Sequence, residues 1–270
     1  MATRYSPRIL ASFLKLNDFA AKIGLLPFIL FITSFSYAQP TDSITGIDHV
    51  TAAVSVTNNG ISLLPTFSLG KPAAIFDMSV GGRKLSFEPQ FRFALSGRPW
   101  SILFWWRYKL MNAEKFSINI GAHPALAFRM APASINGISS ETIMADRYLA
   151  GEFSPNYWIS RSISVGMYYL YSHGFDINAT NNTHFVTLKS DFTSIKLSKT
   201  IFIRITPQIY YLKMDEDGGF YVTSTMILSK KNFPLSVSSI LNKTIRTDIS
   251  ASKDFVWNVS LIYSTGNMLR

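Results

Sequence analysis

Cysteine is absent from this chain of 270 residues, and charged residues are scarce. The absence of cysteine excludes a disulfide framework and thiolate metal sites, and it is compatible with passage through an oxidising compartment. Charged residues make up 16% of the chain, against roughly 25% in average soluble domains. Because hydrophobic residues reach 47%, a soluble protein of this composition would have few polar side chains with which to cover its surface.

A long apolar run is also missing beyond the first forty residues. A membrane-spanning helix needs about 20 consecutive apolar residues, so the chain is apolar overall without a segment that fits such a helix. A transmembrane β-barrel has this composition, because its lipid-facing residues occupy every second position of each strand. The composition therefore favours a barrel over a helical membrane protein.

The N-terminal residues 1–38 have the three parts of a secretory signal peptide. Four basic residues lie within residues 1–22, an apolar run follows at residues 23–35, and the small residues Ser36 and Ala38 come next. The alternative is a permanent N-terminal anchor helix, for which this apolar run is too short. We therefore predict export and cleavage near Ala38.

The mature chain is dominated by alternation of apolar and polar residues. In residues 85–95, Leu, Phe and Pro occupy most odd positions, whereas Ser86, Glu88, Gln90 and Arg92 occupy even positions. The same alternation recurs at residues 100–110, 116–128, 201–211 and 255–263. Each segment has about the ten residues that a tilted membrane strand needs. The alternation predicts one all-β domain without linkers.

We predict a single antiparallel transmembrane β-barrel of about twelve strands. The predicted strands comprise residues 60–69, 73–81, 85–96, 99–111, 115–129, 143–157, 162–172, 184–197, 200–213, 219–229, 233–242 and 254–264. Residues 50–57 also alternate, but a single-chain bacterial barrel has an even number of strands. We therefore assign residues 39–59 to a periplasmic lead-in segment and residues 60–270 to the barrel.

The predicted connections differ in length between the two ends of the barrel. Long loops are expected at residues 130–142, 173–183 and 243–253, which follow odd-numbered strands. Short turns such as residues 82–84 and 198–199 follow even-numbered strands. Long loops at the outer rim and tight turns at the periplasmic rim are typical of outer-membrane barrels.

Alternation alone does not decide which face points inwards, since a soluble barrel or sandwich has the same period with its apolar residues inside. Twelve strands enclose more space than side chains fill, so an apolar interior would leave a large void. Aromatic residues gather near strand ends, as in membrane-interface girdles. We therefore expect the apolar face to contact lipid.

In this architecture residues 39–270 resemble the Gram-negative outer-membrane β-barrel proteins. The resemblance implies location in the outer membrane, with outer-membrane lipid and the barrel-insertion machinery as partners. Such proteins usually end in a strand whose last residue is aromatic. Residues 255–263 have this pattern, but Ser264 to Arg270 follow it.

The sequence predicts no catalytic set, no metal site and no cofactor. Ser172 and His173 adjoin each other at the outer end of a strand, and neighbouring strand residues point to opposite faces. Residues 215–218 resemble half of a calcium loop but lack the remaining ligands. The net charge of +10 comes from scattered residues rather than one basic segment, so we expect no nucleic-acid partner.

Charged residues on the polar face are the main functional clue. A charge on the lipid face would cost about 2–4 kcal/mol near the midplane, so these side chains are expected in the lumen. The predicted lumen-lining side chains are Glu88, Arg92, Arg107, Lys109, Arg129, Lys189, Asp191 and Arg204.

The basic excess among these side chains leads to the hypothesis of a small-solute channel that weakly favours anions. The alternative is a structural or surface-binding barrel in which opposite charges pair across a closed lumen. A lipid-modifying enzyme that uses His173 is a third hypothesis.

Overall fold

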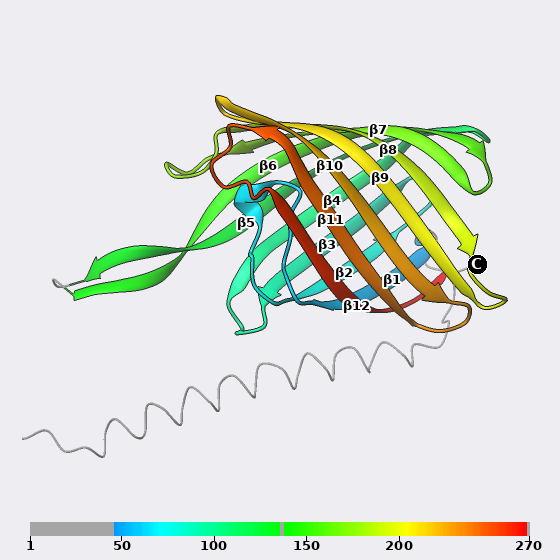
Figure 1. Ribbon diagram of the computed structural model, residues 1–270, viewed down its shortest axis with the longest axis horizontal. Helices are drawn as coiled ribbons and strands as arrows, with labels where there is room; N and C mark the ends of the chain where they lie inside the picture. The colour runs from blue at the N-terminus through cyan, green and yellow to red at the C-terminus, as the bar shows by residue number, and fades with distance from the viewer. Residues whose placement is uncertain (1–45, 136–137, 269–270) are drawn as a thin grey trace, which may run out of the picture. The chain divides into compact units, whose positions relative to one another are not determined.

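The computed structural model describes residues 46–135 and 138–268, so the predicted signal peptide at residues 1–38 lies outside the described residues. The described chain forms a closed antiparallel barrel of twelve strands (Figure 1), as predicted from the alternation. The strands are β1 (His49–Thr57), β2 (Ala73–Gly81), β3 (Leu85–Ala94), β4 (Pro99–Asn112), β5 (Phe116–Ile135), β6 (Ile138–Ser160), β7 (Ile163–Gly174), β8 (Asn182–Lys196), β9 (Ile201–Met214), β10 (Asp217–Lys230), β11 (Leu235–Thr247) and β12 (Phe255–Met268).

The first strand differs from the sequence-based prediction. β1 lies within residues 39–59, the predicted lead-in, and it pairs with both β2 and β12. Residues 60–69, predicted as a strand, instead contain a 3-10 helix, η2 (Pro65–Phe67), within the connection from β1 to β2. The strand count is unchanged, because one strand replaces the other.

The last strand closes the barrel. β12 continues beyond residue 264 to Met268, where Met268 lies opposite His49 of β1. The residues that follow the aromatic run are therefore part of the final strand as far as Met268, because β1 supplies the hydrogen-bonding partner for this extension. Pairing of the first and last strands leaves no open sheet edge at this seam.

The two ends of the barrel have connections of different length. Turns such as residues 82–84 and 161–162 lie at one end, and the longer connections at residues 58–72, 175–181 and 248–254 lie at the other. The predicted loop at residues 130–142 was wrong, because β5 and β6 continue there. β5 and β6 extend past the part of each strand that pairs with β4 or β7. In this extension the described residues of β5 and β6 pair with each other and form the hairpin that projects from the barrel (Figure 1).

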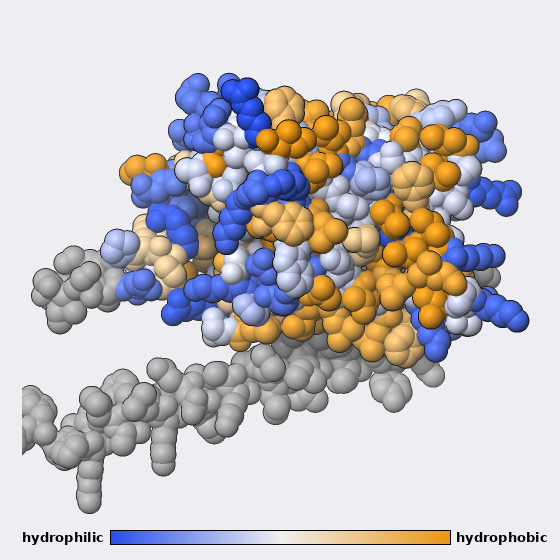
Figure 2. All heavy atoms as spheres, viewed as in Figure 1, coloured by the Kyte–Doolittle hydropathy of each residue, from blue (hydrophilic) through white to orange (hydrophobic). Residues whose placement is uncertain are grey.

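The outer surface of the barrel is apolar. On β8 the side chain of Leu188 is 60% exposed, whereas the neighbouring Thr187 is 2% exposed. The exposed side chains of Trp106, Ile209 and Trp257 repeat this pattern on other strands. Hydrophobic side chains form broad areas of the surface, and hydrophilic ones gather at both ends (Figure 2). This distribution is typical of a barrel surrounded by lipid.

None of the helices in the described part of the chain is long and apolar enough to cross a membrane.

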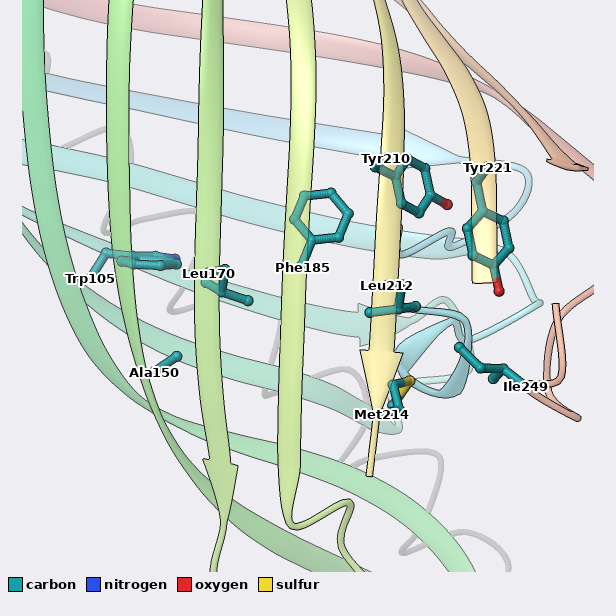
Figure 3. Packing of buried hydrophobic residues seen from close by; sticks show 9 residues of the cluster. All are labelled: Trp105, Ala150, Leu170, Phe185, Tyr210, Leu212, Met214, Tyr221 and Ile249. Atoms are coloured by element: carbon teal, nitrogen blue, oxygen red, sulfur yellow. The ribbon is translucent and has the colours of Figure 1, made fainter. Parts of the chain in front are cut away.

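The inside of the barrel contains a hydrophobic cluster. Its members project to the same side from neighbouring strands and from one loop (Figure 3). They are Trp105, Ala150, Leu170, Phe185, Tyr210, Leu212, Met214, Tyr221 and Ile249. An apolar cluster on the enclosed face needs apolar partners inside the barrel.

We expect Leu188→Arg to lower the free energy of unfolding by about 2–4 kcal/mol, because it places a charge against lipid near the middle of a strand. Urea unfolding in lipid vesicles measures the change. Ser154→Arg on the enclosed face of β6 is the control, with an expected change of less than about 1 kcal/mol. Equal destabilisation by both substitutions would contradict the assignment of the apolar face to lipid.

Candidate functional site

Residues 58–72 form a segment that packs against the inward-facing hydrophobic cluster, and we call it the inserted segment. Leu63, Leu64 and Phe67 are partly buried against the cluster. The hydroxyl of Tyr210 donates a hydrogen bond to the carbonyl oxygen of Leu63 (3.3 Å), and the rings of Phe67 and Tyr148 meet edge to face at 5.1 Å. The inserted segment therefore fills part of the space that the twelve strands enclose.

Internal hydrogen bonds hold the inserted segment in a compact form. The backbone N–H of Ser62 donates to Oγ of Ser68 (2.9 Å), and this hydroxyl donates to the carbonyl of Ser62 (3.0 Å). The N–H of Leu69 donates to the carbonyl of Gly60 (2.9 Å). The segment can leave the sheet without losing all of its backbone partners, because it supplies several of its own.

A bulge in the wall anchors the inserted segment. The register between β3 and β4 shifts between Arg92 and Phe93, so Trp100 becomes an extra residue of β4. The alternation at residues 100–110 puts Trp100 in the apolar set that is expected to contact lipid, but its side chain is only 4% exposed, and its Nε1 donates to the carbonyl of Phe67 (2.7 Å). A bulge redirects a side chain in this way. Gly60 lies so close that an added Cβ would be 3.0 Å from the indole of Trp100.

Two cavities lie beside the inserted segment. The outer cavity, of about 710 Å³, is lined by Phe67, Arg98, Arg129 and Tyr148 among others. The inner chamber, of about 330 Å³, shares Phe67, Ser101 and Tyr148 with the outer cavity. Because the same side chains border both spaces, Phe67 and Tyr148 form the partition between them.

The inner chamber combines apolar walls with basic groups. Its apolar lining includes Leu103, Trp105, Leu170 and Phe185. Arg92, Arg107 and His123 also line it. No Asp or Glu belongs to the described lining. The chamber is therefore basic and largely apolar.

Arg107 is held by two carboxylates at the edge of the inner chamber. It forms ion pairs with Glu88 and with Glu152 (Nε to Oε1, 2.7 Å). The hydroxyl of Tyr168 also donates to Glu152 (2.8 Å). The guanidinium of Arg107 lies 4.3 Å from the ring centre of Trp105. These contacts fix the Arg107 side chain and balance its charge.

Two further ion pairs involve residues predicted from the sequence. Arg129 Nε lies 2.7 Å from Asp146, and Arg204 Nε lies 3.0 Å from Asp191. Asp191 also accepts a hydrogen bond from Thr206 (2.7 Å). The structure thus brings Glu88 and Arg107 together, and Asp191 and Arg204 together, across neighbouring strands.

The remaining predicted cations, Arg92, Lys109 and Lys189, form no ion pair with another described residue. Arg92 donates to Gln90 (2.9 Å) and lies 5.3 Å from the ring centre of Trp100. Neither Lys109 nor Lys189 has an ion-pair partner within residues 46–135 and 138–268. Arg92 differs from these lysines because it lines the inner chamber.

The sequence-based reasoning missed three carboxylates, Asp77, Asp146 and Glu152. Asp146 and Glu152 pair with predicted cations, and Asp77 interacts with Arg92 through space. Each of the three occupies a polar position in an alternating strand, so the pattern that identified the arginines could also have identified them. With these carboxylates included, the basic excess on which the anion hypothesis rested is largely offset.

The outer rim contains a separate ion pair. Arg147 Nη2 lies 2.8 Å from Asp176 in the loop between β7 and β8. The hydrogen bonds from Arg147 hold the pKa of Asp176 below its ordinary value. This pair is on the outer side of the wall, away from the inner chamber, and serves to tie the loop to β6.

The residues considered for catalysis do not meet. Ser172 lines the inner chamber, whereas His173 contacts Phe175 edge to face at 4.9 Å. In the described part of the chain, no cluster of His, Asp and Glu has a metal-binding arrangement.

Glu152→Gln is expected to destabilise the barrel by about 3–5 kcal/mol, because Glu152 is 3% exposed and its loss leaves part of the Arg107 charge uncompensated. Asp191→Asn, at the more exposed pair with Arg204, should cost less than about 1 kcal/mol. Urea unfolding measures both. Equal effects would show that burial does not determine the strength of these pairs.

Comparisons with known proteins identify similar barrels only among solved structures. No family model matches the chain, and no curated protein matches it. The KdgM porin is 12% identical, with a TM-score of 0.45, over 80% of this chain and 99% of that chain. The NanC porin is 8% identical, with a TM-score of 0.45, over 82% and 100%. OmpT of Vibrio cholerae is 8% identical, with a TM-score of 0.40, over 84% and 100%. The chain thus resembles outer-membrane β-barrel porins at low identity, without a specific subfamily.

Proposed function

We propose that the protein is exported, loses residues 1–38, and acts in the outer membrane as a non-enzymatic channel for small solutes. Outer-membrane lipid surrounds the barrel, and the insertion machinery places it there. The observation that carries the proposal is the pair of adjoining cavities inside a closed barrel whose outer surface is apolar. A solute would pass from the outer cavity to the inner chamber between Phe67 and Tyr148.

The inserted segment sets the width of the proposed path. Leu63, Leu64 and Phe67 occupy the enclosed space next to Tyr210 and Tyr148. Their position favours passage of small solutes over large ones. The ion pairs Arg129–Asp146 and Arg204–Asp191 each join neighbouring strands, so these charges line the wall without crossing the space.

The second candidate is a structural or surface-binding barrel with a closed lumen. The packing of the inserted segment against the hydrophobic cluster favours it, because apolar side chains exclude water from that part of the interior. The β5–β6 hairpin would then supply surface for a partner.

Single-channel conductance in planar bilayers separates the two candidates. We expect the wild-type protein to conduct, and the double substitution Leu63→Ser and Phe67→Ser to raise the conductance, because it removes apolar packing from the constriction. Leu228→Ser, an exposed residue on the outer face of β10, is the matched control and should leave conductance unchanged. Absence of conductance in both the wild type and the double variant would favour the closed barrel.

We also propose a weak anion preference, which would arise in the inner chamber and not along the whole lumen. Within the described lining, the chamber has two arginines and no carboxylate, and of the two Arg107 is paired with Glu88 and Glu152. Arg92→Gln should shift the reversal potential in a salt gradient towards cations, since it removes the arginine without an ion-pair partner. Arg147→Gln, on the outer rim, should leave the reversal potential unchanged. An unchanged potential in Arg92→Gln would reject the anion preference.

A further inference from the structure

Two polar atoms beside the inner chamber are buried without a hydrogen-bond partner among the described residues. They are Nε of Arg92 and Oγ of Ser101, and these residues lie directly opposite each other on β3 and β4. Both residues also line the inner chamber. Buried polar groups are almost always paired, so two adjacent orphans at one cavity wall indicate a missing partner.

The missing partner must accept hydrogen bonds. The guanidinium of Arg92 offers only donors, and the hydroxyl of Ser101 can donate as well. The one hydrogen bond that the Arg92 side chain makes within the described chain goes from Nη2 to Gln90. A group with two acceptor oxygens, such as a carboxylate, matches the fork of an arginine and can accept from the adjacent hydroxyl.

The charge of the site favours an anion. Arg107 is already matched by Glu88 and Glu152. Asp77 acts on Arg92 through space, and the two form no ion pair among the described residues. The Nε of Arg92 is buried without a direct counter-ion in the described chain, which is costly, and a bound anion would relieve that cost.

The remaining walls of the inner chamber define the rest of the ligand. Leu103, Trp105 and Phe185 present apolar and aromatic surface on the enclosed side. The volume of about 330 Å³ corresponds to roughly eleven water molecules at about 30 Å³ each. It lies at the lower end of the range for small-molecule sites.

We propose that the inner chamber binds an organic monocarboxylate with a compact apolar or aromatic body. The carboxylate lies at Arg92 and Ser101, and the body contacts Leu103, Trp105 and Phe185. The inference rests on the proposed channel function, in which this chamber is a binding step along the path. Protein atoms cover Nε and Oγ, so the proposal requires the Arg92 side chain to turn towards the ligand on binding.

Isothermal titration of the refolded chain in detergent micelles tests the proposal with three probes. 4-Phenylbutyrate carries both features, 4-phenylbutyramide lacks the charge, and gluconate lacks the apolar body. We expect 4-phenylbutyrate to bind about tenfold or more tightly than either of the others, as a charge-assisted hydrogen bond predicts. Equal binding of the amide, or equal binding of gluconate, would overturn the proposed ligand class.

Variants assign the effect to the chamber. Arg92→Gln should remove the advantage of 4-phenylbutyrate over its amide, and Arg92→Lys should retain part of it. Arg147→Gln, which removes an arginine from the outer rim, should retain all of it and controls for partition into micelles. The heat-induced shift in gel mobility verifies that each variant is folded. Unchanged binding in folded Arg92→Gln would place the ligand elsewhere.

Conductance of the same preparations separates this inference from the proposed function. A barrel that conducts but does not distinguish the carboxylate from its amide would refute the chamber site alone. A barrel that binds 4-phenylbutyrate at Arg92 without conducting would refute the channel and leave a binding site in a closed barrel. If only water satisfies Arg92 and Ser101, the carboxylate and the amide will give the same heats, which again refutes the site.

Discussion

The structure depends on one constraint: within lipid, every backbone N–H and C=O must find its partner in the protein. A sheet meets this requirement only if it closes, and pairing of β1 with β12 from His49 opposite Met268 to Thr57 opposite Ser260 closes it here. Closure of twelve strands encloses more space than the wall side chains fill. The inserted segment and the hydrophobic cluster are the response of this chain to that excess space, because together they pack part of the interior.

The same enclosure determines how charges are arranged. An isolated charge inside the barrel is poorly hydrated, and three of the six predicted cations pair with carboxylates, as Arg107 adjoins Glu88 and Glu152 and Arg129 adjoins Asp146. Such pairs contribute little net stability but are costly to break. Of the two arginines in the described lining of the inner chamber, Arg92 is the exception, since it lies beside apolar walls with one neutral hydrogen-bond partner. An exception of this kind indicates function more strongly than the paired residues do.

The alternation of residues predicted the strands well because it reports directly on the two faces of a sheet. β2 has the predicted bounds, and most other strands differ by a few residues at their ends. The strand predicted at residues 60–69 was wrong, although Ile61, Leu63, Phe67 and Leu69 alternate there as a lipid-facing strand would. Alternation shows that a face is apolar but not what that face contacts, and here Leu63 and Phe67 contact the interior of the barrel. The site was less predictable, because the bulge that turns Trp100 inwards depends on the β3–β4 register.

The inserted segment also explains how a closed interior and a solute path can belong to one protein. Fully burying a large apolar side chain contributes about 1.5–3 kcal/mol, and Leu63, Leu64 and Phe67 are only partly buried. The segment keeps several of its own hydrogen bonds, and the bonds from Tyr210 and Trp100 are among those that tie it to the wall. Its displacement therefore costs less than full burial of the three side chains would, and the displaced form is a minor state. A ligand that binds the inner chamber more tightly when Phe67 moves aside would increase that population by its difference in affinity, so occupancy of the chamber and opening of the path would be coupled.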